Sequence, residues 1–394
     1  VTLCFFLILT FHTTSWRFSN MTNEKYKPLL EPFGFSNGVS LKNRIVMAPM
    51  TNYSSNEDGT VSDEEVAYYI RRSKGVGMVI TACTYGTPNG QGFPGEFAAH
   101  TDQMIPSLKR LASAIKDEGA KAILQIFHAG RQVPKEIAPN GDVVSASAVA
   151  YPAEGKPVPR ALTENEIEAI INDFGEMTRR AIEAGYDGVE IHGANTYLIQ
   201  QFFSPHSNRR TDRFGGTLEK RMTFPLAVVD KVERVVNEYA IEPFIVGYRF
   251  SPEEPEEPGI TMADTLILVD RLASKNLDYL HVSLMDFWST PKSGVEETRS
   301  RIELLQEVIG GRVPLIGVGS IYTAEDARKA LTSGVPLIGL GRELLIDPEW
   351  VQKIEQGRED EIVTKLEIDK QKELELPTPL WQRILKNPGW VPGI

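Results

Sequence analysis

The chain has 394 residues, of which 41% are hydrophobic and 24% are charged, a composition typical of a globular protein that buries a core. The formal net charge of −11 argues against nucleic acids and anionic membranes as partners, because both need a basic face. The only two cysteines, Cys4 and Cys83, lack the spacing of a disulfide framework or of a metal site. We therefore expect a cytoplasmic protein in a reducing compartment, with no zinc or iron–sulfur centre.

The first twenty residues contain a short apolar run at residues 3–11. This run is too short to span a bilayer. It has the length of a signal-peptide core, but no Lys or Arg precedes it, and residues 15–18 make a poor cleavage site. We predict that the protein starts at Met21 and that residues 1–20 are non-native, translated upstream sequence, with a signal peptide as the alternative.

From Asn43 onward, short runs rich in β-branched residues alternate with amphipathic stretches. Strands are predicted at residues 44–47, 76–81, 121–127, 187–191, 244–250, 279–283, 314–318 and 336–340. Helices are predicted at residues 62–74, 102–118, 163–184, 217–239, 262–275, 299–309, 323–333 and 348–356. Two of the helix starts carry capping signals, Ser62 as an N-cap and Thr163-x-x-Glu166 as a capping box.

Eight strand–helix units therefore follow one another, and the strands are apolar almost throughout, as a sheet covered on both faces requires. Eight such units in one domain predict an α/β fold, a single (β/α)8 TIM barrel, over residues 21–376. The segment 28–41, with a Ser-Asn-Gly turn signal, is predicted to form an N-terminal hairpin that caps the bottom of the barrel. Residues 377–394, which hold Trp381 and Trp390, are predicted to form a C-terminal arm on the barrel or on a partner subunit.

In a barrel of this type, active-site groups lie at the C-terminal ends of the strands, and the loops after strands seven and eight frequently hold a phosphate. The sequence places a Gly-x-Gly pair at each of these two ends, Gly317 with Gly319 and Gly339 with Gly341, and Arg342 follows the second pair. Glycines let backbone N–H groups approach an anion, and an arginine can bind it through two N–H groups. The alternative is that the glycines only permit tight turns. Their coincidence with these two strand ends favours a phosphate site.

The fourth strand runs into His192, which is followed by Asn195 and Tyr197. If the chain begins a helical turn there, His192 and Asn195 face the same way and both donate to one acceptor. Two neutral donors beside a phenol that stays protonated below pH ~10 indicate an acid-catalysed reduction. A structural core histidine is the alternative for His192. A catalytic triad, H-E-x-x-H, a Walker loop and a Gly-x-Gly-x-x-Gly after the first strand are all absent from the sequence, so a built-in dinucleotide domain is not expected.

Five motifs occur in order along the chain. They are residues 43–51 (NRIVMAPMT), 125–131 (QIFHAGR), 192–197 (HGANTY), 204–216 (SPHSNRRTDRFGG) and 341–342 (GR). Together they resemble the old yellow enzyme family of NAD(P)H-dependent flavin oxidoreductases, and the similarity extends over residues 25–357. The resemblance implies FMN held non-covalently at the barrel mouth, NADH or NADPH as the electron donor, and a small-molecule electrophile as the substrate.

The resemblance also implies which residues form the site. The FMN contacts would be Pro49, Met50 and Thr51 along the isoalloxazine, Cys83 on the same face, Gln125 at the pyrimidine edge, Arg249 near N1 and O2, and Gly319, Gly341 and Arg342 at the phosphate. His192 and Asn195 would bind the carbonyl oxygen of the substrate, and Tyr197 would supply the proton. Tyr53 is a candidate wall of the substrate pocket.

Two features limit what the resemblance carries over. Thr51 and Asn195 stand where one branch of the family has a cysteine and a histidine, so redox potential and substrate preference are not taken from that branch. Larger relatives add an iron–sulfur cluster and a dinucleotide domain, and the cysteines for such a cluster are missing here. We therefore expect this chain to take hydride directly from NAD(P)H.

We interpret the chain as an FMN-dependent NAD(P)H oxidoreductase that reduces activated C=C bonds of α,β-unsaturated carbonyl or nitro compounds. One alternative is another FMN barrel oxidoreductase, of the hydroxy-acid oxidase type, in which a histidine base takes a proton from the substrate. The other is a flavin-carrying binding protein without an organic substrate. The sequence leaves open the physiological substrate, the choice between NADH and NADPH, and the oligomeric state, with a homo-oligomer among the options.

Overall fold

The structure is a computed structural model that describes residues 22–296 and 298–394. The prediction that residues 1–20 are upstream sequence lies outside these described residues. Within them, no helix is long and apolar enough to cross a membrane.

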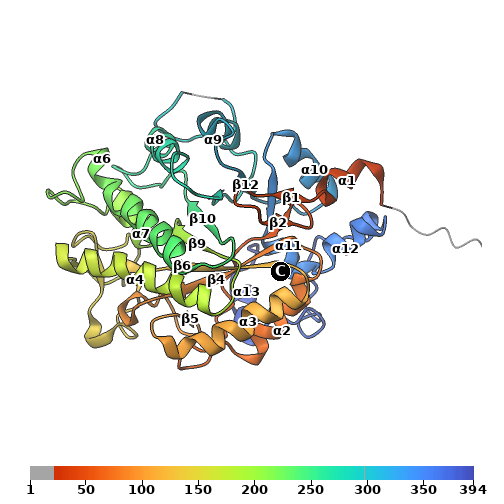
Figure 1. Ribbon diagram of the computed structural model, residues 1–394, viewed down its shortest axis with the longest axis horizontal. Helices are drawn as coiled ribbons and strands as arrows, with labels where there is room; N and C mark the ends of the chain where they lie inside the picture. Colours follow the sequence, from red (N-terminus) through yellow and green to blue (C-terminus); the bar gives the residue numbers. More distant parts are fainter. Residues whose placement is uncertain (1–21, 297) are drawn as a thin grey trace, which may run out of the picture.

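Eight parallel strands of the described chain close into a barrel (Figure 1). They are β3 (Ile45–Met47), β4 (Met78–Tyr85), β6 (Lys121–Phe127), β9 (Gly188–Gly193), β10 (Ile245–Phe250), β11 (Tyr279–Val282), β12 (Leu315–Val318) and β13 (Leu337–Leu340). Neighbours in the ring pair in parallel, and β3 bonds to both β13 and β4, which closes the sheet. The predicted (β/α)8 barrel is confirmed.

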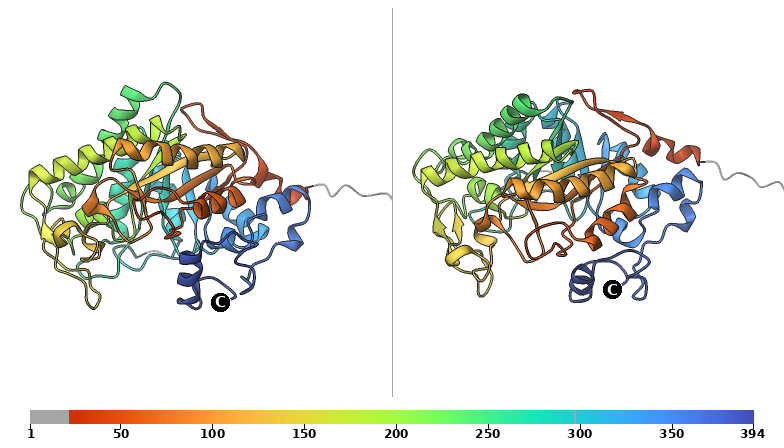
Figure 2. Two further views of the ribbon diagram at one scale, coloured as in Figure 1. Left: turned by 90° about the horizontal axis from the view of Figure 1, so that it is seen from below. Right: turned by 60° about the horizontal axis from the view of Figure 1, so that its bottom comes forward.

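The helices lie around the outside of the strands (Figures 1 and 2). They are α1 (Lys27–Leu30), α2 (Asp63–Ser73), α3 (Ile105–Asp117), α4 (Glu164–Glu183), α5 (Leu198–Phe203), α6 (Leu218–Arg221), α7 (Thr223–Tyr239), α8 (Met262–Leu272), α9 (Arg301–Ile309), α10 (Ala324–Thr332), α11 (Arg342–Ile346), α12 (Trp350–Glu355) and α13 (Thr378–Leu385). The N-cap at Ser62 and the capping box at Thr163 are confirmed, because each side-chain oxygen accepts from the backbone three residues on.

Helix α4 shows why these segments fold as they do. Its buried apolar residues recur at helical spacing, as with Ile167, Ile171 and Phe174, so one stripe of the helix faces the barrel. Each such side chain contributes about 1.5–3 kcal/mol through removal from water. Packing of this stripe, together with the caps, therefore fixes the helix against the strands.

Three short strands and one helix break were not predicted. Strand β5 (Phe97–Ala98) adds to β4, and β7 (Val144–Ser145) pairs in parallel with β8 (Arg160–Ala161) inside the long loop before α4. Pairs of two residues carry no hydrophobic periodicity, so a sequence pattern cannot reveal them. The predicted helix 217–239 is divided into α6 and α7 at Met222.

The hairpin β1 (Phe33–Gly34) and β2 (Ser40–Leu41) closes one end of the barrel, as predicted. Phe35 and Leu41 join an apolar cluster inside the barrel, and the Phe35 ring centroid lies 6.3 Å from that of Tyr279. The other members of this cluster come from seven barrel strands: Val46, Met78, Ile80, Ile123, Ile245, Tyr279, Ile316 and Leu337. The inside of the barrel is filled at this end, and a barrel of this type places its active site at the C-terminal ends of the strands.

The C-terminal arm folds back onto the barrel of its own chain. Trp381 of α13 is 7% exposed, and the backbone N–H of Leu366 donates to the carbonyl oxygen of Pro392 at 2.7 Å. Figure 2 shows the arm, in dark blue, on the side of the molecule opposite the red hairpin. The arm therefore belongs to the end of the barrel where the site is expected.

Candidate active site

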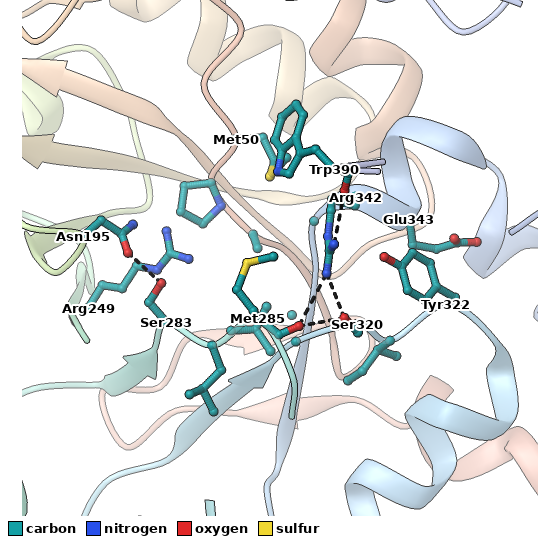
Figure 3. A pocket seen from close by; sticks show the side chains of 18 residues that line it. Met50, Asn195, Arg249, Ser283, Met285, Ser320, Tyr322, Arg342, Glu343 and Trp390 are labelled. Atoms are coloured by element: carbon teal, nitrogen blue, oxygen red, sulfur yellow. Dashed lines mark hydrogen bonds between the residues drawn. The ribbon is translucent and has the colours of Figure 1, made fainter. Parts of the chain in front are cut away.

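A cavity of about 340 Å³ lies at the C-terminal end of the barrel, beside the loops that follow β12 and β13 (Figure 3). The predicted site residues among its lining are Pro49, Met50, Asn195, Arg249, Gly319, Gly341 and Arg342. These residues come from five separate strand ends, those of β3, β9, β10, β12 and β13, which the closed barrel brings together. The strand-end rule thus locates a real cavity.

Arg342 follows Gly341 directly and begins α11. Its Nη2 donates to the hydroxyl of Ser320 at 2.8 Å, and its Nη1 donates to the carbonyl oxygen of Trp390 at 3.2 Å (Figure 3). The guanidinium also lies 5.7 Å from the ring centroid of Tyr322. The β12 loop and the C-terminal arm therefore hold a cation at the cavity edge, which suits the phosphate of a bound nucleotide.

Glycine leaves room at two places on this wall. Gly319 has φ +136°, and a Cβ there would lie 2.6 Å from the backbone nitrogen of Phe287. A Cβ on Gly341 would lie 3.2 Å from the sulfur of Met50. A side chain at either position would strain the loop or fill the cavity, so both glycines keep room for a ligand against the backbone.

Arg249 lies at the end of β10 and faces the cavity, although only 8% of the residue is exposed (Figure 3). Burial lowers the pKa of its guanidinium, and the nearby Glu190 carboxylate opposes that shift. Its Nε atom is buried without an acceptor among the described residues. A buried donor that lacks a partner is costly, so the site calls for a ligand acceptor at this position. The N1 and O2 atoms of a flavin meet that need, and Arg249 therefore fits FMN.

His192 is buried and Tyr197 is half-buried, and their ring centroids lie 5.1 Å apart. The backbone N–H of Ala194 donates to His192 Nδ1 at 3.4 Å, so the neutral imidazole carries its proton on Nε2. Burial lowers the pKa of His192 well below its ordinary value, and the positive charge of Arg249 adds to this. Burial likewise raises the pKa of Tyr197 well above its ordinary value. At neutral pH the pair is a neutral N–H donor and a protonated phenol.

The helical turn expected from His192 does not form. Asn195 and Thr196 have φ values of 55° and 65°, so the chain turns sharply before α5 begins. The amide oxygen of Asn195 instead accepts from the Ser283 hydroxyl at 2.8 Å (Figure 3). This leaves Nδ2 as the Asn195 group that can donate into the cavity. His192 and Asn195 are thus positioned by different neighbours, not by a shared helix face.

Tyr53 lies outside the lining of this cavity, in a strained backbone conformation with φ 56°. Its ring centroid lies 4.9 Å from that of Phe93, and the Arg383 guanidinium of α13 lies 5.1 Å from the Tyr53 ring. Burial raises the pKa of the Tyr53 phenol, whereas Arg383 lowers it. The Tyr53 ring thus contacts the C-terminal arm, and its place in the wall of the substrate pocket stays a prediction.

Cys83 and Thr51 lie together, also beyond the cavity lining. The buried Cys83 thiol interacts with the side chains of Thr51 and Glu96. One Glu96 oxygen accepts from the backbone N–H of Gly92 at 2.7 Å, and the other is buried without a partner among the described residues. Burial raises the pKa of Glu96 well above its ordinary value. Gln125 lies on β6, where its Nε2 donates to Glu190 at 2.7 Å.

Several residues around the cavity were not predicted from the sequence. Ser283 directly follows β11 and Ser320 lies two residues after the end of β12, so the strand-end rule was sufficient to find them. Trp390 and Arg383 belong to the arm, and their approach to the site is a long-range contact that no local pattern encodes. Glu96 follows a glycine-rich loop and gives no sequence signal.

The model of the NADH:flavin oxidoreductase / NADH oxidase family matches residues 28–361 of the chain. The probable NADH-dependent flavin oxidoreductase YqiG of Bacillus subtilis (strain 168) is 56% identical over 370 residues, which cover 94% of this chain and 99% of that protein. The NADH:fumarate oxidoreductase of Klebsiella pneumoniae (strain 342) is 43% identical over 360 residues. That match covers 90% of this chain but only 38% of the Klebsiella protein.

Among solved structures, the old yellow enzyme homologue from Zymomonas mobilis superimposes with a TM-score of 0.71 at 26% identity. The superposition covers 82% of this chain and 91% of that one. The resemblance in the sequence motifs is thereby confirmed. With a matching family model, a close full-length relative and a cavity whose residues fit FMN, the chain belongs to the NADH:flavin oxidoreductase / NADH oxidase family and is an NAD(P)H-dependent FMN oxidoreductase of the old yellow enzyme type.

Proposed function

We propose that the chain reduces the activated C=C bond of α,β-unsaturated carbonyl or nitro compounds with electrons from NADH or NADPH. The observation that carries this proposal is the pairing of a buried, neutral His192 with a half-buried, protonated Tyr197 at the barrel end that holds the cavity. Such a pair can polarise a carbonyl without taking a proton from the substrate. When bound, FMN supplies the hydride-transfer chemistry.

Each side chain then has a defined task. The Nε2–H of His192 and the Nδ2–H of Asn195 bind the carbonyl oxygen of the substrate, where negative charge develops. Tyr197 holds a proton at its phenol oxygen and delivers it to the α-carbon. Ser283 keeps the Asn195 amide in the donating orientation. Arg342 and Ser320 bind the FMN phosphate at the opposite wall.

A second candidate is supply of NADH electrons to a separate acceptor protein. It is favoured by the 43% identity to a stretch that makes up 38% of the NADH:fumarate oxidoreductase of Klebsiella pneumoniae. In that case the site oxidises NADH and need not hold an organic electrophile. We also propose a cytoplasmic location, which the scarcity of cysteine supports.

The test is anaerobic reduction of the purified holoprotein by NADH and by NADPH. The rate of reoxidation is then measured with each acceptor of a panel. The panel contains an enone, a nitroalkene, fumarate and an artificial one-electron acceptor. Fast reoxidation by the enone and the nitroalkene supports the proposal. Reoxidation by the one-electron acceptor alone supports electron supply instead. Rapid bleaching of the oxidised holoprotein by a 2-hydroxy acid would favour a hydroxy-acid oxidase.

A further inference from the structure

A layer of polar side chains lies inside the barrel, above the apolar cluster at the hairpin end. Gln125 of β6, Glu190 of β9 and His281 of β11 form it, and none of them is more than 2% exposed. The amide Nε2 of Gln125 donates to Glu190 Oε1 at 2.7 Å. His281 Nδ1 lies 2.8 Å from the other carboxylate oxygen, Oε2. Glu190 is thus the centre of the layer, and each of its oxygens has a partner from a different strand.

Glu190 is charged although it is fully buried. Burial raises the pKa of its carboxyl, but the hydrogen bonds from His281 and Gln125 and the positive charge of Arg249 outweigh burial and hold that pKa below its ordinary value. Burial also lowers the pKa of His281, so the imidazole is neutral and donates from Nδ1. The charge of Glu190 is therefore balanced by Arg249, the cation that faces the cavity.

The contact with Glu190 also fixes which end of the Gln125 side-chain amide points away from Glu190. Glu190 is an anion, so only the NH₂ group of Gln125 can be directed at it. The amide oxygen of Gln125 must then point elsewhere, and it can only accept. A flavin pyrimidine carries a single N–H group between two carbonyl oxygens. An accepting Gln125 oxygen matches that N–H, whereas an inverted amide would not.

We propose that Glu190 is a positioning residue for FMN with two roles. Its carboxylate fixes the orientation of the Gln125 amide, and its charge opposite Arg249 sets how strongly the site prefers reduced over oxidised FMN. Reduced flavin carries additional negative charge near N1, and Arg249 stabilises it. The carboxylate of Glu190 offsets part of that stabilisation. Removal of the Glu190 charge therefore strengthens binding of reduced FMN relative to oxidised FMN. This inference rests on the FMN site and is independent of the organic substrate.

The experiment separates charge from orientation with two variants and one control. Glu190→Gln keeps the size and can still pair with both neighbours, because its amide accepts from Gln125 and donates to the other tautomer of His281. Glu190→Asp keeps the charge but cannot reach both partners. Asp278→Asn is the control. Asp278 directly precedes β11, away from the cavity, and its buried carboxylate accepts from the backbone N–H of Val246 on β10.

For each protein, the dissociation constant of oxidised FMN is measured by titration of the apoprotein. The ratio of the constants for oxidised and reduced FMN follows from the midpoint potentials of bound and free FMN. Glu190→Gln should raise that ratio about tenfold or more, as expected for removal of one unit charge at short range. Its constant for oxidised FMN should stay within about threefold of wild type, because both hydrogen bonds can be kept.

Glu190→Asp should weaken binding of oxidised FMN and leave the ratio near the wild-type value, and Asp278→Asn should change neither quantity. An unchanged ratio in Glu190→Gln would overturn the proposal, as would an equal rise in Asp278→Asn. A Glu190→Gln protein that fails to fold while Glu190→Asp folds would also overturn it, because the carboxylate would then serve barrel stability. A raised ratio in a protein that reduces no enone would contradict the proposed function alone.

Discussion

Among single residues, the proposed reduction rests on the pairing of His192 with Tyr197. We expect Tyr197→Phe to slow reoxidation of the reduced holoprotein by an enone about 10²–10⁴-fold, the usual value of a positioned general acid. Reduction by NADH or NADPH should be nearly unchanged, because that half-reaction needs no proton from the phenol. Stopped-flow traces of the two half-reactions measure both rates.

The matched control is Tyr186→Phe, which alters another buried phenol that has no hydrogen-bond partner among the described residues. It should affect neither half-reaction. Equal slowing of both half-reactions by Tyr197→Phe would mean that Tyr197 only shapes the pocket.

Ser283 is expected to matter through Asn195. Its hydroxyl donates to the Asn195 amide oxygen, so Ser283→Ala releases the amide to rotate. We expect phenols, which mimic an enolate, to bind about fivefold more weakly, the value of one hydrogen bond of about 1 kcal/mol. Charge-transfer titration of the holoprotein with a phenol measures this. Ser289→Ala, on the same loop but bonded to the Asp286 backbone, should bind phenols as wild type does.

The cavity-lining residues Asn195, Arg249 and Arg342 could be predicted from the sequence, because the strand ends of a barrel converge at one face. The orientation of their side chains could not be predicted. The amide of Asn195 is turned by Ser283, and the guanidinium of Arg342 is held by Trp390, 48 residues further along the chain. Such contacts depend on the three-dimensional packing and leave no spacing rule in the sequence.

At the scale of elements, the capping box of α2 contains a buried acid that makes stability depend on pH. Burial raises the pKa of Glu65 to about 8 in the folded chain, against an ordinary value of 4.5 that is expected on unfolding. Between these values the folded state binds more protons, so the free energy of unfolding falls as pH rises. Glu65→Gln removes this slope. Its free energy of unfolding should therefore increase relative to wild type from pH 5 to pH 8.

Urea denaturation at several pH values measures that difference. Glu64→Gln, at the exposed neighbouring position, should follow the pH profile of wild type. Parallel profiles for wild type and Glu65→Gln would show that Glu65 is already ionised in the folded protein.

Helix α13 is expected to anchor the arm through Trp381. This side chain is 7% exposed, and replacement of a buried tryptophan by alanine typically costs about 3–5 kcal/mol of unfolding free energy. Trp381→Ala should show a loss of this size in denaturant titrations and should also weaken FMN binding, because the arm carries the carbonyl that holds Arg342. Gln382→Ala, at an exposed position of the same helix, should change neither. Wild-type FMN affinity in Trp381→Ala would mean that the arm is not part of the site.

The long helices and strands were predictable because their hydrophobic residues recur at a regular spacing. The β4 strand illustrates the limit, since it continues to Tyr85 beyond its predicted end at residue 81, across a register shift between Ile80 and Cys83. A register shift breaks the hydrophobic pattern, and neighbouring strands, not propensity, carry the chain past it. Tertiary pairing thus decided the ends of elements whose existence the sequence predicted.

For the whole molecule, eight repeated units predicted the closed barrel, and the hairpin cap left one open end for chemistry. The return of the arm to that end was not decided by the sequence, which allowed contact with a partner subunit equally well. The structure combines a rigid barrel, which fixes the strand ends, with loops and an arm that complete the cavity.

The central claim, that this site reduces activated C=C bonds, is tested most directly by one anaerobic turnover. Holoprotein is reduced with one equivalent of NADH or NADPH, mixed with excess 2-cyclohexenone, and analysed for product. We expect reoxidation of the bound FMN and one cyclohexanone per FMN. Holoprotein that stays reduced with the enone, and yields no saturated ketone, would contradict it.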